Sequence, residues 1–225
     1  MEQEFWRERW RSGRIGFHRD HVNPHLARHL HAWLEDESSH DILVPLCGKS
    51  IDVAWLAEQG HRVAGVEFIE DAVEAFFNDH QLSYRKEQAS CGPVWRPQDA
   101  AADDFRFYQC DFFELTPETV GSIDRIFDRA ALIAIEPARR EMYARHLMSF
   151  LPAGGRLLLS AIAYDQSLVE GPPFSVTPQD VERLFGAAGS LACLDECPTD
   201  AVPPKFAEAG VPEVLEHCWL LVKGE

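Results

Sequence analysis

The feature that most constrains this chain is a buried apolar run that ends in a glycine turn, followed by a strand that ends on a carboxylate. Ile42-Leu43-Val44-Pro45-Leu46 leads into Cys47-Gly48-Lys49-Ser50. His61–Val66 forms the second run, and Glu67 follows it 19 positions after Gly48. A doubly wound α/β sheet holds a nucleoside in this way, with backbone at the first strand end and a carboxylate for the ribose hydroxyls at the second. The pattern predicts a nucleoside-binding α/β fold.

Size and composition predict one globular domain. The 225 residues suffice for a substantial core. A net charge of −16 argues against a nucleic-acid or anionic membrane partner, because both attract clustered Lys and Arg. The first residues lack a signal-peptide pattern, and no apolar run reaches membrane-spanning length. The six scattered cysteines are typical of reduced thiols, so we expect a cytoplasmic protein.

Alternating strand and helix patterns predict a doubly wound, mostly parallel sheet of seven strands. A short helix at 2–11 and a second at 24–34, opened by the Asn23-Pro24 cap, precede it. Residues 84–104 read as a long loop or hairpin. The last two strands follow each other without a helical pattern, which predicts one antiparallel strand. The expected strands are 41–46, 61–67, 105–110, 123–127, 156–163, 190–196 and 214–223.

The sequence does not match either of two common phosphate-binding motifs. Gly48-Lys49-Ser50 suggests a phosphate loop, but Leu43 stands where that loop needs its first glycine. The dinucleotide fingerprint needs three glycines, and this turn supplies one. The missing glycines argue against a pyrophosphate ligand and against a nicotinamide-dependent oxidoreductase. A turn with a single glycine is compatible with S-adenosylmethionine, because this ligand carries no phosphate.

Two further strand ends carry candidate binding residues. Asp111 and Phe112 follow the third strand, where an adenine would lie, although a helix cap with a core phenylalanine explains them equally well. Asp128 and Arg129 end the fourth strand, beside the point where ligands bind such sheets. A surface ion pair is the alternative for the second pair, and the position favours binding.

The N-terminal histidines and Cys47 have less specific interpretations. His21, His25 and His29 would align on a continuous helix, but the Asn23-Pro24 cap puts His21 outside it. We therefore expect a solvated helix face and no metal site. Cys47 precedes a helix, which would lower the pKa of its thiol. No nucleophile motif surrounds it, so we interpret it as a small residue at a crowded turn.

Together these residues resemble the thiopurine S-methyltransferase family, especially its bacterial members. The resemblance runs in order through nearly the whole chain, and its most specific element is the Pro-Leu-Cys-Gly-Lys stretch. The matching segments are Phe5-Trp6 through Trp10, Ile15-Gly16-Phe17-His18, Val44 to Ser50, Gly65-Val66-Glu67, Phe127 to Leu132, Tyr164-Asp165 and Gly171-Pro172-Pro173-Phe174. It implies a class I methyltransferase that uses S-adenosylmethionine and releases S-adenosylhomocysteine.

The resemblance also implies roles for individual residues. Cofactor contacts fall to Trp10, Leu46 (by its backbone), Glu67 (to the ribose), Asp111 and Phe112 (beside the adenine), and Arg129. Arg129 would also be catalytic, lying between cofactor and acceptor. Phe17, Pro172 and Lys205 would contact the acceptor. Lys205 stands where mammalian members carry arginine, and its point charge lacks the planar fork of that residue.

The expected reaction is methyl transfer to a thiol or thiolate, such as a thiopurine or aromatic thiol, with reduced selenium or tellurium species as further acceptors. Residues 1–34 would cover the site of a single domain spanning 1–225, and residues 1–22 would close as a lid. We expect a monomer. Two alternatives stay open: a halide or inorganic thiolate methyltransferase, and a non-catalytic S-adenosylmethionine-binding protein.

Overall fold

Side-chain caps define where several helices begin. In the computed structural model, which describes residues 3–99, 104–199 and 202–225, the Asn23 side chain accepts a hydrogen bond from the Leu26 amide at 3.0 Å. Ser50 caps the next long helix by accepting from the Asp52 amide. Thr177 and Asp180 form a reciprocal capping box. These local signals confirm the helix starts that the sequence predicts.

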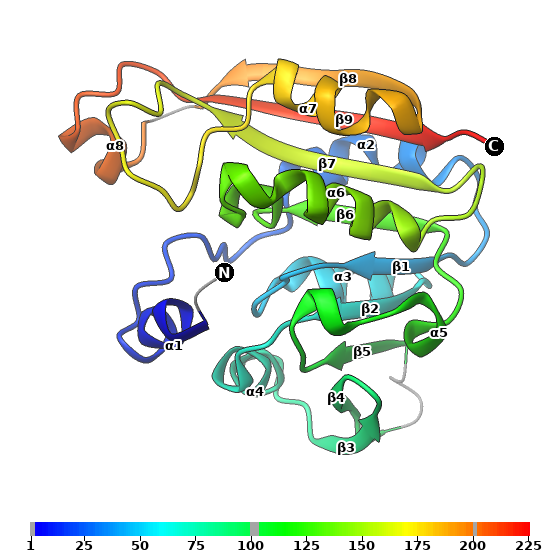
Figure 1. Cartoon of the computed structure of the whole chain (residues 1–225). Helices are drawn as coiled ribbons and strands as arrows, with labels where there is room; N and C mark the ends of the chain where they lie inside the picture. Colours follow the sequence, from blue (N-terminus) through cyan, green and yellow to red (C-terminus); the bar gives the residue numbers. More distant parts are fainter. Residues whose placement is uncertain (1–2, 100–103, 200–201) are drawn as a thin grey trace.

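Helices and strands alternate through most of the chain (Figure 1). The helices are α1 (Gln3–Arg11), α2 (Pro24–Leu34), α3 (Ile51–Glu58), α4 (Glu70–Asp79), α5 (Pro117–Val120), α6 (Arg140–Ser149), α7 (Pro178–Phe185) and α8 (Pro204–Glu208). The strands are β1 (Asp41–Val44), β2 (Arg62–Val66), β3 (Tyr84–Ala89), β4 (Gly92–Pro97), β5 (Phe105–Tyr108), β6 (Arg125–Arg129), β7 (Arg156–Ala163), β8 (Gly189–Pro198) and β9 (Leu215–Lys223).

One sheet contains all nine strands, in the order β3-β4-β5-β2-β1-β6-β7-β9-β8. The five strands from β5 to β7 run parallel. β9 is antiparallel to both of its neighbours, β7 and β8. Seven strands therefore form the predicted sheet with its reversed strand. The hairpin β3–β4 extends one edge, since β4 pairs antiparallel with β5.

The connection between β8 and β9 differs from the prediction. We expected no helix there, but α8 forms within it, with Pro204 in its first turn. A five-residue helix is too short to show a clear apolar period in sequence, which explains the error. Phe206 of α8 packs with Val169, Val211 and Val214 in a small separate cluster.

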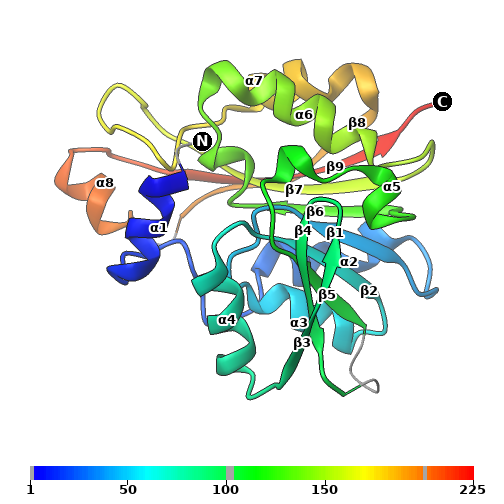
Figure 2. The same ribbon diagram turned by 60° about the horizontal axis from the view of Figure 1, so that its bottom comes forward.

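Helices cover both faces of the sheet, and each face has its own apolar cluster. On one face, side chains of α2, α3 and α4 pack on the sheet, with Trp33 and Phe76 fully buried. On the other, α6 and α7 do so through residues such as Tyr143 and Phe185. Figures 1 and 2 show α1 and α8 outside this sandwich, beyond the carboxyl ends of the parallel strands. No described helix is long and apolar enough to span a bilayer.

Candidate active site

The turn after β1 brings backbone close to the carboxyl edge of the sheet. Leu46 and Gly48 both have left-handed backbone, with φ of 48° and 56°. A Cβ on Gly48 would lie 3.1 Å from the Trp10 ring, so glycine lets that indole cover the turn. A Cβ on Gly65 would lie only 2.9 Å from the Cys47 sulfur, so the glycine leaves room for this thiol. The Trp10 ring thus lies against the turn that contains Leu46 and Gly48.

Cys47 is a crowded small residue, as predicted, but its expected acidity is wrong. Burial raises the pKa of its thiol well above the ordinary value, and the nearby Glu67 carboxylate acts in the same direction. Desolvation therefore outweighs any effect of the helix that follows. The thiol is a packing group at pH 7.

Glu67 links the loops that follow β1 and β2. Its Oε2 accepts a hydrogen bond from the Gly48 amide at 3.0 Å, and its Oε1 accepts from the Ile69 amide at 2.7 Å. Burial raises the pKa of Glu67 to about 7, although the backbone donors oppose that shift. Each carboxylate oxygen keeps a second lone pair, so both can still accept from vicinal hydroxyls.

Asp128 and Tyr143 fix the turn that carries Arg129. Asp128 is fully buried, and its Oδ2 accepts a hydrogen bond from the Tyr143 hydroxyl at 2.7 Å. Its Oδ1 accepts from the Leu132 amide at 3.1 Å, which closes a turn through Ala130 at a φ of 62°. Arg129 thereby leaves the end of β6 in a defined direction. The sequence analysis favours a binding role for Asp128 over a surface ion pair, and the structure instead makes this carboxylate an internal support.

A cavity of about 810 Å³ opens at this edge of the sheet. It brings together most of the residues that the sequence selected. Those on its wall are Trp10, Phe17, Leu46, Glu67, Arg129, Pro172 and Lys205. Contributors come from the N-terminal segment, the ends of β1, β2, β6 and β7, and the loops around α8. The volume accommodates a nucleoside together with a second small molecule.

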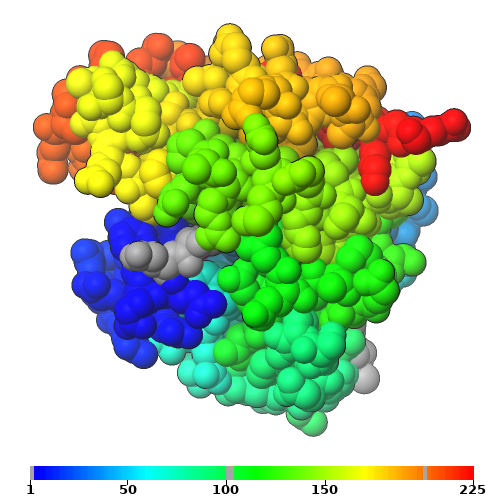
Figure 3. Space-filling model, in the orientation of Figure 1, coloured from blue at the N-terminus to red at the C-terminus, as the bar shows by residue number. Residues whose placement is uncertain are grey.

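The N-terminal segment forms one wall through an aromatic cluster. Phe17 packs edge-on against Trp6 and Trp10, with ring centroids 5.6 and 5.8 Å apart. α1 itself has no buried residue, although Trp6, Arg9 and Trp10 face the cavity. Figure 3 shows this blue segment at the surface, near the yellow loop that follows β7. The segment forms part of the cavity wall, and α1 contributes no buried residue to the core.

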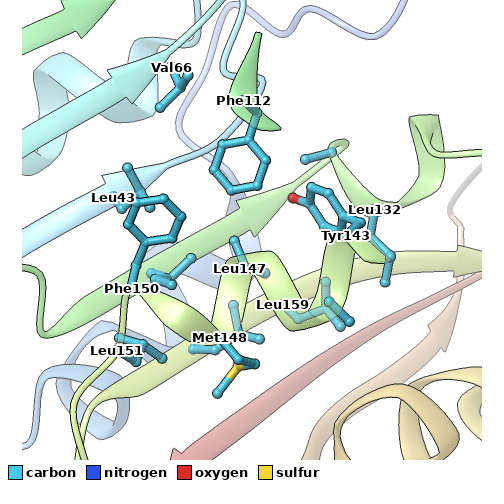
Figure 4. Packing of buried hydrophobic residues seen from close by; sticks show 14 of the residues in the cluster. Leu43, Val66, Phe112, Leu132, Tyr143, Leu147, Met148, Phe150, Leu151 and Leu159 are labelled. Atoms are coloured by element: carbon cyan, nitrogen blue, oxygen red, sulfur yellow. The ribbon is translucent and has the colours of Figure 1, made fainter. Parts of the chain in front are cut away.

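Asp111 and Phe112 lie beside the cavity and not on its wall. Asp111 caps a short 3-10 helix, Phe112–Glu114, by accepting from the Phe113 amide at 3.0 Å. Phe112 packs into the core, 5.4 Å from the Tyr143 ring and 5.7 Å from the Phe150 ring between centroids (Figure 4). Both residues line a narrow adjoining recess that shares Leu46 and Phe68 with the main cavity. Gln3 of α1 also lines this recess.

Lys205 holds the loop that carries Pro172. Its ammonium donates hydrogen bonds to the carbonyl oxygens of Glu170 and Pro172, at 2.8 and 3.0 Å. Burial, with the positive charge of Arg9, lowers the pKa of Lys205. The side chain therefore shapes the wall directly, and one of its three N–H donors remains for a ligand.

Positive charge dominates the cavity wall of this acidic protein. Seven Arg and Lys residues line it against three carboxylates, in a chain whose net charge is −16. Arg9, Arg19 and Arg129 make no ion pair with any described carboxylate. Burial lowers the pKa of Arg129, with Arg19 acting in the same direction and Asp52 opposing, but a guanidinium stays charged at pH 7. The remaining charged lining residues are Arg14, Arg28, Lys49, Lys205, Asp52, Glu67 and Glu216.

The histidines depart from the solvated helix face that we expected. His25 is buried, and its ring Nδ1 lies 3.1 Å from the Ser160 hydroxyl in the cavity wall. His21 precedes α2, as predicted, beside Asp20. Within residues 3–99, 104–199 and 202–225, no group of three or more His, Cys, Asp and Glu side chains could hold a metal ion. The Asn23-Pro24 cap predicts where α2 begins, but it does not predict that His25 at this end of the helix contacts Ser160 of β7.

Comparison with known proteins identifies the family. The family model described as "Thiopurine S-methyltransferase (TPMT)" matches residues 1–224. The chain belongs to this family. A thiopurine S-methyltransferase of Pseudomonas fluorescens (strain Pf0-1) is 43% identical over 221 residues, covering 97% of this chain and 98% of that protein. One from Oryctolagus cuniculus is 34% identical over 220 residues, covering 98% and 89%. The chain is therefore an S-adenosylmethionine-dependent methyltransferase.

Solved structures confirm the fold class. The Burkholderia thailandensis 1,6-didemethyltoxoflavin-N1-methyltransferase, with 1,6-didemethyltoxoflavin and S-adenosylhomocysteine bound, aligns with a TM-score of 0.63 at 20% identity. The alignment covers 99% of this chain and 87% of that one. TehB from Haemophilus influenzae aligns with a TM-score of 0.61 at 13% identity, covering 96% and 67%. These likenesses establish a class I methyltransferase fold.

Proposed function

We propose that this enzyme transfers the methyl group of S-adenosylmethionine to a thiolate carried by a small molecule, such as a thiopurine or an aromatic thiol. The observation that carries the proposal is the Arg129 guanidinium, which lines the cavity at the end of β6 without an ion-pair partner among the described residues. A positive group in a partly dry site favours an anionic acceptor. The positive wall around it acts in the same direction.

The residues at the ends of β1 and β2 fit the cofactor. Glu67 would accept the ribose hydroxyls, Leu46 would offer its backbone to the methionine part, and Trp10 would cover them. Asp111 and Phe112 would flank the adenine from the adjoining recess, which requires α1 to shift at Gln3. Bound S-adenosylmethionine supplies a methyl group already activated by its sulfonium. The protein therefore needs mainly to align the acceptor and exclude water.

The acceptor half of the site lies over β6 and β7. Arg129 would hold the thiolate, Phe17 would face its ring, and Lys205 would fix the loop of Pro172 against it. Trp10 and Phe17 can also face a sulfonium through cation–π contact, worth on the order of 1–2 kcal/mol when desolvated. Reduced selenium or tellurium anions are soft nucleophiles of the same charge, so we propose them as further acceptors.

Residues 1–34 would act as the cover of a single domain, with 1–22 closing over the bound cofactor. The cavity wall formed by Trp6, Trp10 and Phe17 supports this role. We also propose a monomer. Among the described residues, the large apolar side chains that are exposed are Met142 on α6 and Leu168 in the loop between β7 and α7, and two such side chains make no patch of interface size.

Arg129→Gln tests the assignment, with Arg145→Gln as control because Arg145 is an exposed arginine on α6 outside the cavity. Arg129→Gln should lower kcat/KM for an aromatic thiolate by about 100-fold, as the loss of a charge-stabilising group does in other enzymes. Its dissociation constant for S-adenosylmethionine, measured by calorimetry, should stay within about threefold of the parent value.

The parent enzyme is assayed on an aromatic thiol, a thiopurine, hydrogen selenide and iodide. Methylation of iodide alone would favour the halide alternative. Tight cofactor binding with no turnover on any of the four acceptors would favour a non-catalytic binding protein. Equal losses of affinity and turnover in Arg129→Gln would make Arg129 a cofactor ligand only.

A further inference from the structure

His25 occupies a fixed position at the start of α2. Asn23 caps this helix, and the Asn23 amide donates a hydrogen bond to Asp52 Oδ1 at 2.8 Å, which ties α2 to the start of α3. The His25 side chain is 5% exposed and lines the cavity. Such a buried imidazole is held in place by its surroundings.

Ser160 fixes the orientation of the imidazole ring. His25 Nδ1 lies 3.1 Å from Ser160 Oγ. When Nδ1–H donates to this hydroxyl, Nε2 carries the free lone pair. No hydrogen bond joins His25 Nε2 to any described residue. The pair therefore presents an imidazole that can accept a proton in the cavity.

The sheet register puts this pair on the acceptor side of Arg129. Arg129 of β6 is the register partner of Ser160 of β7, so both side chains leave the same face of neighbouring strands. Sheet order is β2, β1, β6, β7. Along the strand ends, Glu67 and Leu46 therefore lie on one side of Arg129, and Ser160 with His25 lies on the other. The cofactor half and the imidazole flank the guanidinium.

The surroundings keep His25 neutral at pH 7. Burial is the main cause that lowers its pKa, and His29 and Arg28 of the same helix act in the same direction. Asp195 of β8 and Glu216 of β9 oppose the shift. Asp195 pairs with Arg28, which weakens its effect, and the N-terminal end of α2 also disfavours an imidazolium.

We propose that His25 is a general base that removes the proton from acceptors that reach the site as neutral thiols, with Ser160 as its positioning residue. The inference rests on the proposed thiol methylation. The acceptor S–H proton passes to His25 Nε2, and the acceptor sulfur forms a bond to the methyl carbon. The bond from that carbon to the sulfonium sulfur breaks, with its electron pair left on that sulfur. The imidazolium then releases its proton to water.

Two acceptors of different acidity test this role. An alkyl thiol is only a few per cent ionised at pH 7, whereas a nitro-substituted aromatic thiol is already a thiolate. His25→Gln keeps a side-chain amide for Ser160 but provides no base. It should lower kcat/KM for the alkyl thiol by about 100-fold and leave the aromatic thiolate within about threefold. His31→Gln, an exposed histidine on the same helix, should change neither rate.

The pH profile and chemical rescue provide two further activity readouts. With the alkyl thiol, and with S-adenosylmethionine kept saturating so that the pH-dependent affinity set by Glu67 does not contribute, the parent rate should fall as pH drops through the pKa of His25, below about 6.5. In His25→Gln the bend at the pKa of His25 should disappear, and the rate should instead rise with pH up to the higher pKa of the thiol itself. Added imidazole should restore the rate of His25→Ala with the alkyl thiol only.

A readout independent of turnover uses the cofactor-free protein. The imidazole NMR signal of His25 should titrate below pH 6.5 and should move in Ser160→Ala, which loses the hydroxyl partner. Equal losses with both thiols in His25→Gln would overturn the proposal, as would unchanged rates with both. If the parent methylates neither thiol, the proposed function itself fails, which is a different result.

Discussion

At the scale of single residues, the buried carboxylate of Glu67, our proposed ribose ligand, costs the fold stability when it ionises. Its carboxylate is buried against two backbone amides, yet burial still raises its pKa to about 7. A raised carboxyl pKa means that the fold prefers the protonated form, so ionisation of Glu67 makes the cofactor-free fold less stable as pH rises from about 4.5 through 7. A ligand that donates hydroxyl groups to the carboxylate reverses this preference.

The affinity for S-adenosylmethionine should therefore depend on pH through Glu67. Below pH 7 the dissociation constant should rise, approaching about tenfold per pH unit, because the ribose hydroxyls need an acceptor. Glu67→Gln should bind weakly at pH 8 and lose this dependence. Glu58→Gln, an exposed position at the end of α3, serves as the control. Calorimetry between pH 5.5 and 8.5 measures the dissociation constants of the parent and of both variants. A parent dissociation constant that does not change with pH would exclude the ribose role of Glu67.

At the scale of elements, the hydrogen bond between Tyr143 and Asp128 joins α6 to the end of β6. Burial raises the pKa of Asp128 to about 6, and the hydrogen bond from Tyr143 opposes the shift. The protonated acid is thus favoured in the fold, and stability is lost as pH rises through about 6. The Tyr143 hydroxyl limits that loss by donating to the carboxylate.

Tyr143→Phe should consequently destabilise the protein more at high pH. At pH 8 the free energy of unfolding should fall by about 1.5–3 kcal/mol, the value of a hydrogen bond to a charged group. At pH 5, where Asp128 is mostly protonated, the loss should be nearer 1 kcal/mol. Urea unfolding at both pH values measures the difference. Tyr84→Phe, whose hydroxyl makes a long surface contact, is the control. An equal loss at both pH values would contradict the role of the charge.

At the scale of the whole molecule, an acidic protein surrounds a positively charged cavity, and the N-terminal segment that we propose as its cover belongs to no layer of the sandwich. The net charge of −16 keeps the surface negative, while the cavity wall carries more cations than carboxylates. The anionic acceptor that we propose would therefore be attracted by the wall and not by the surface at large. The cover matters because these interactions strengthen when water is excluded.

Deleting residues 1–22 should separate the cover from the fold. Since α1 buries none of its residues and the Asn23 cap is retained, thermal unfolding and circular dichroism should remain close to those of the parent. Turnover of an aromatic thiolate should fall by about 100-fold, because the acceptor loses alignment and shelter. Full activity of the truncated protein would exclude the lid. Trp10→Ala in the full chain is the second variant, with the same expected direction.

The sequence by itself determined the structural features that depend on residues close together in the chain. The caps at Asn23, Ser50 and Thr177 and the glycine turn depend on interactions over a few positions, and the structure bears out these local predictions. The ribose role of Glu67 stays a prediction. The reversed last strand was predictable from a missing crossover helix, although the short α8 was not. The family follows from the same stretches.

Only the tertiary structure decided which distant groups share the site. His25 and Ser160 are 135 positions apart, and their contact depends on where α2 lies on the sheet. The same holds for Asp128, which the fold turns inward to Tyr143, and for Phe112, which it directs into the core. The energies that decide these contacts come from burial and packing between elements, and no local pattern of residue types encodes them.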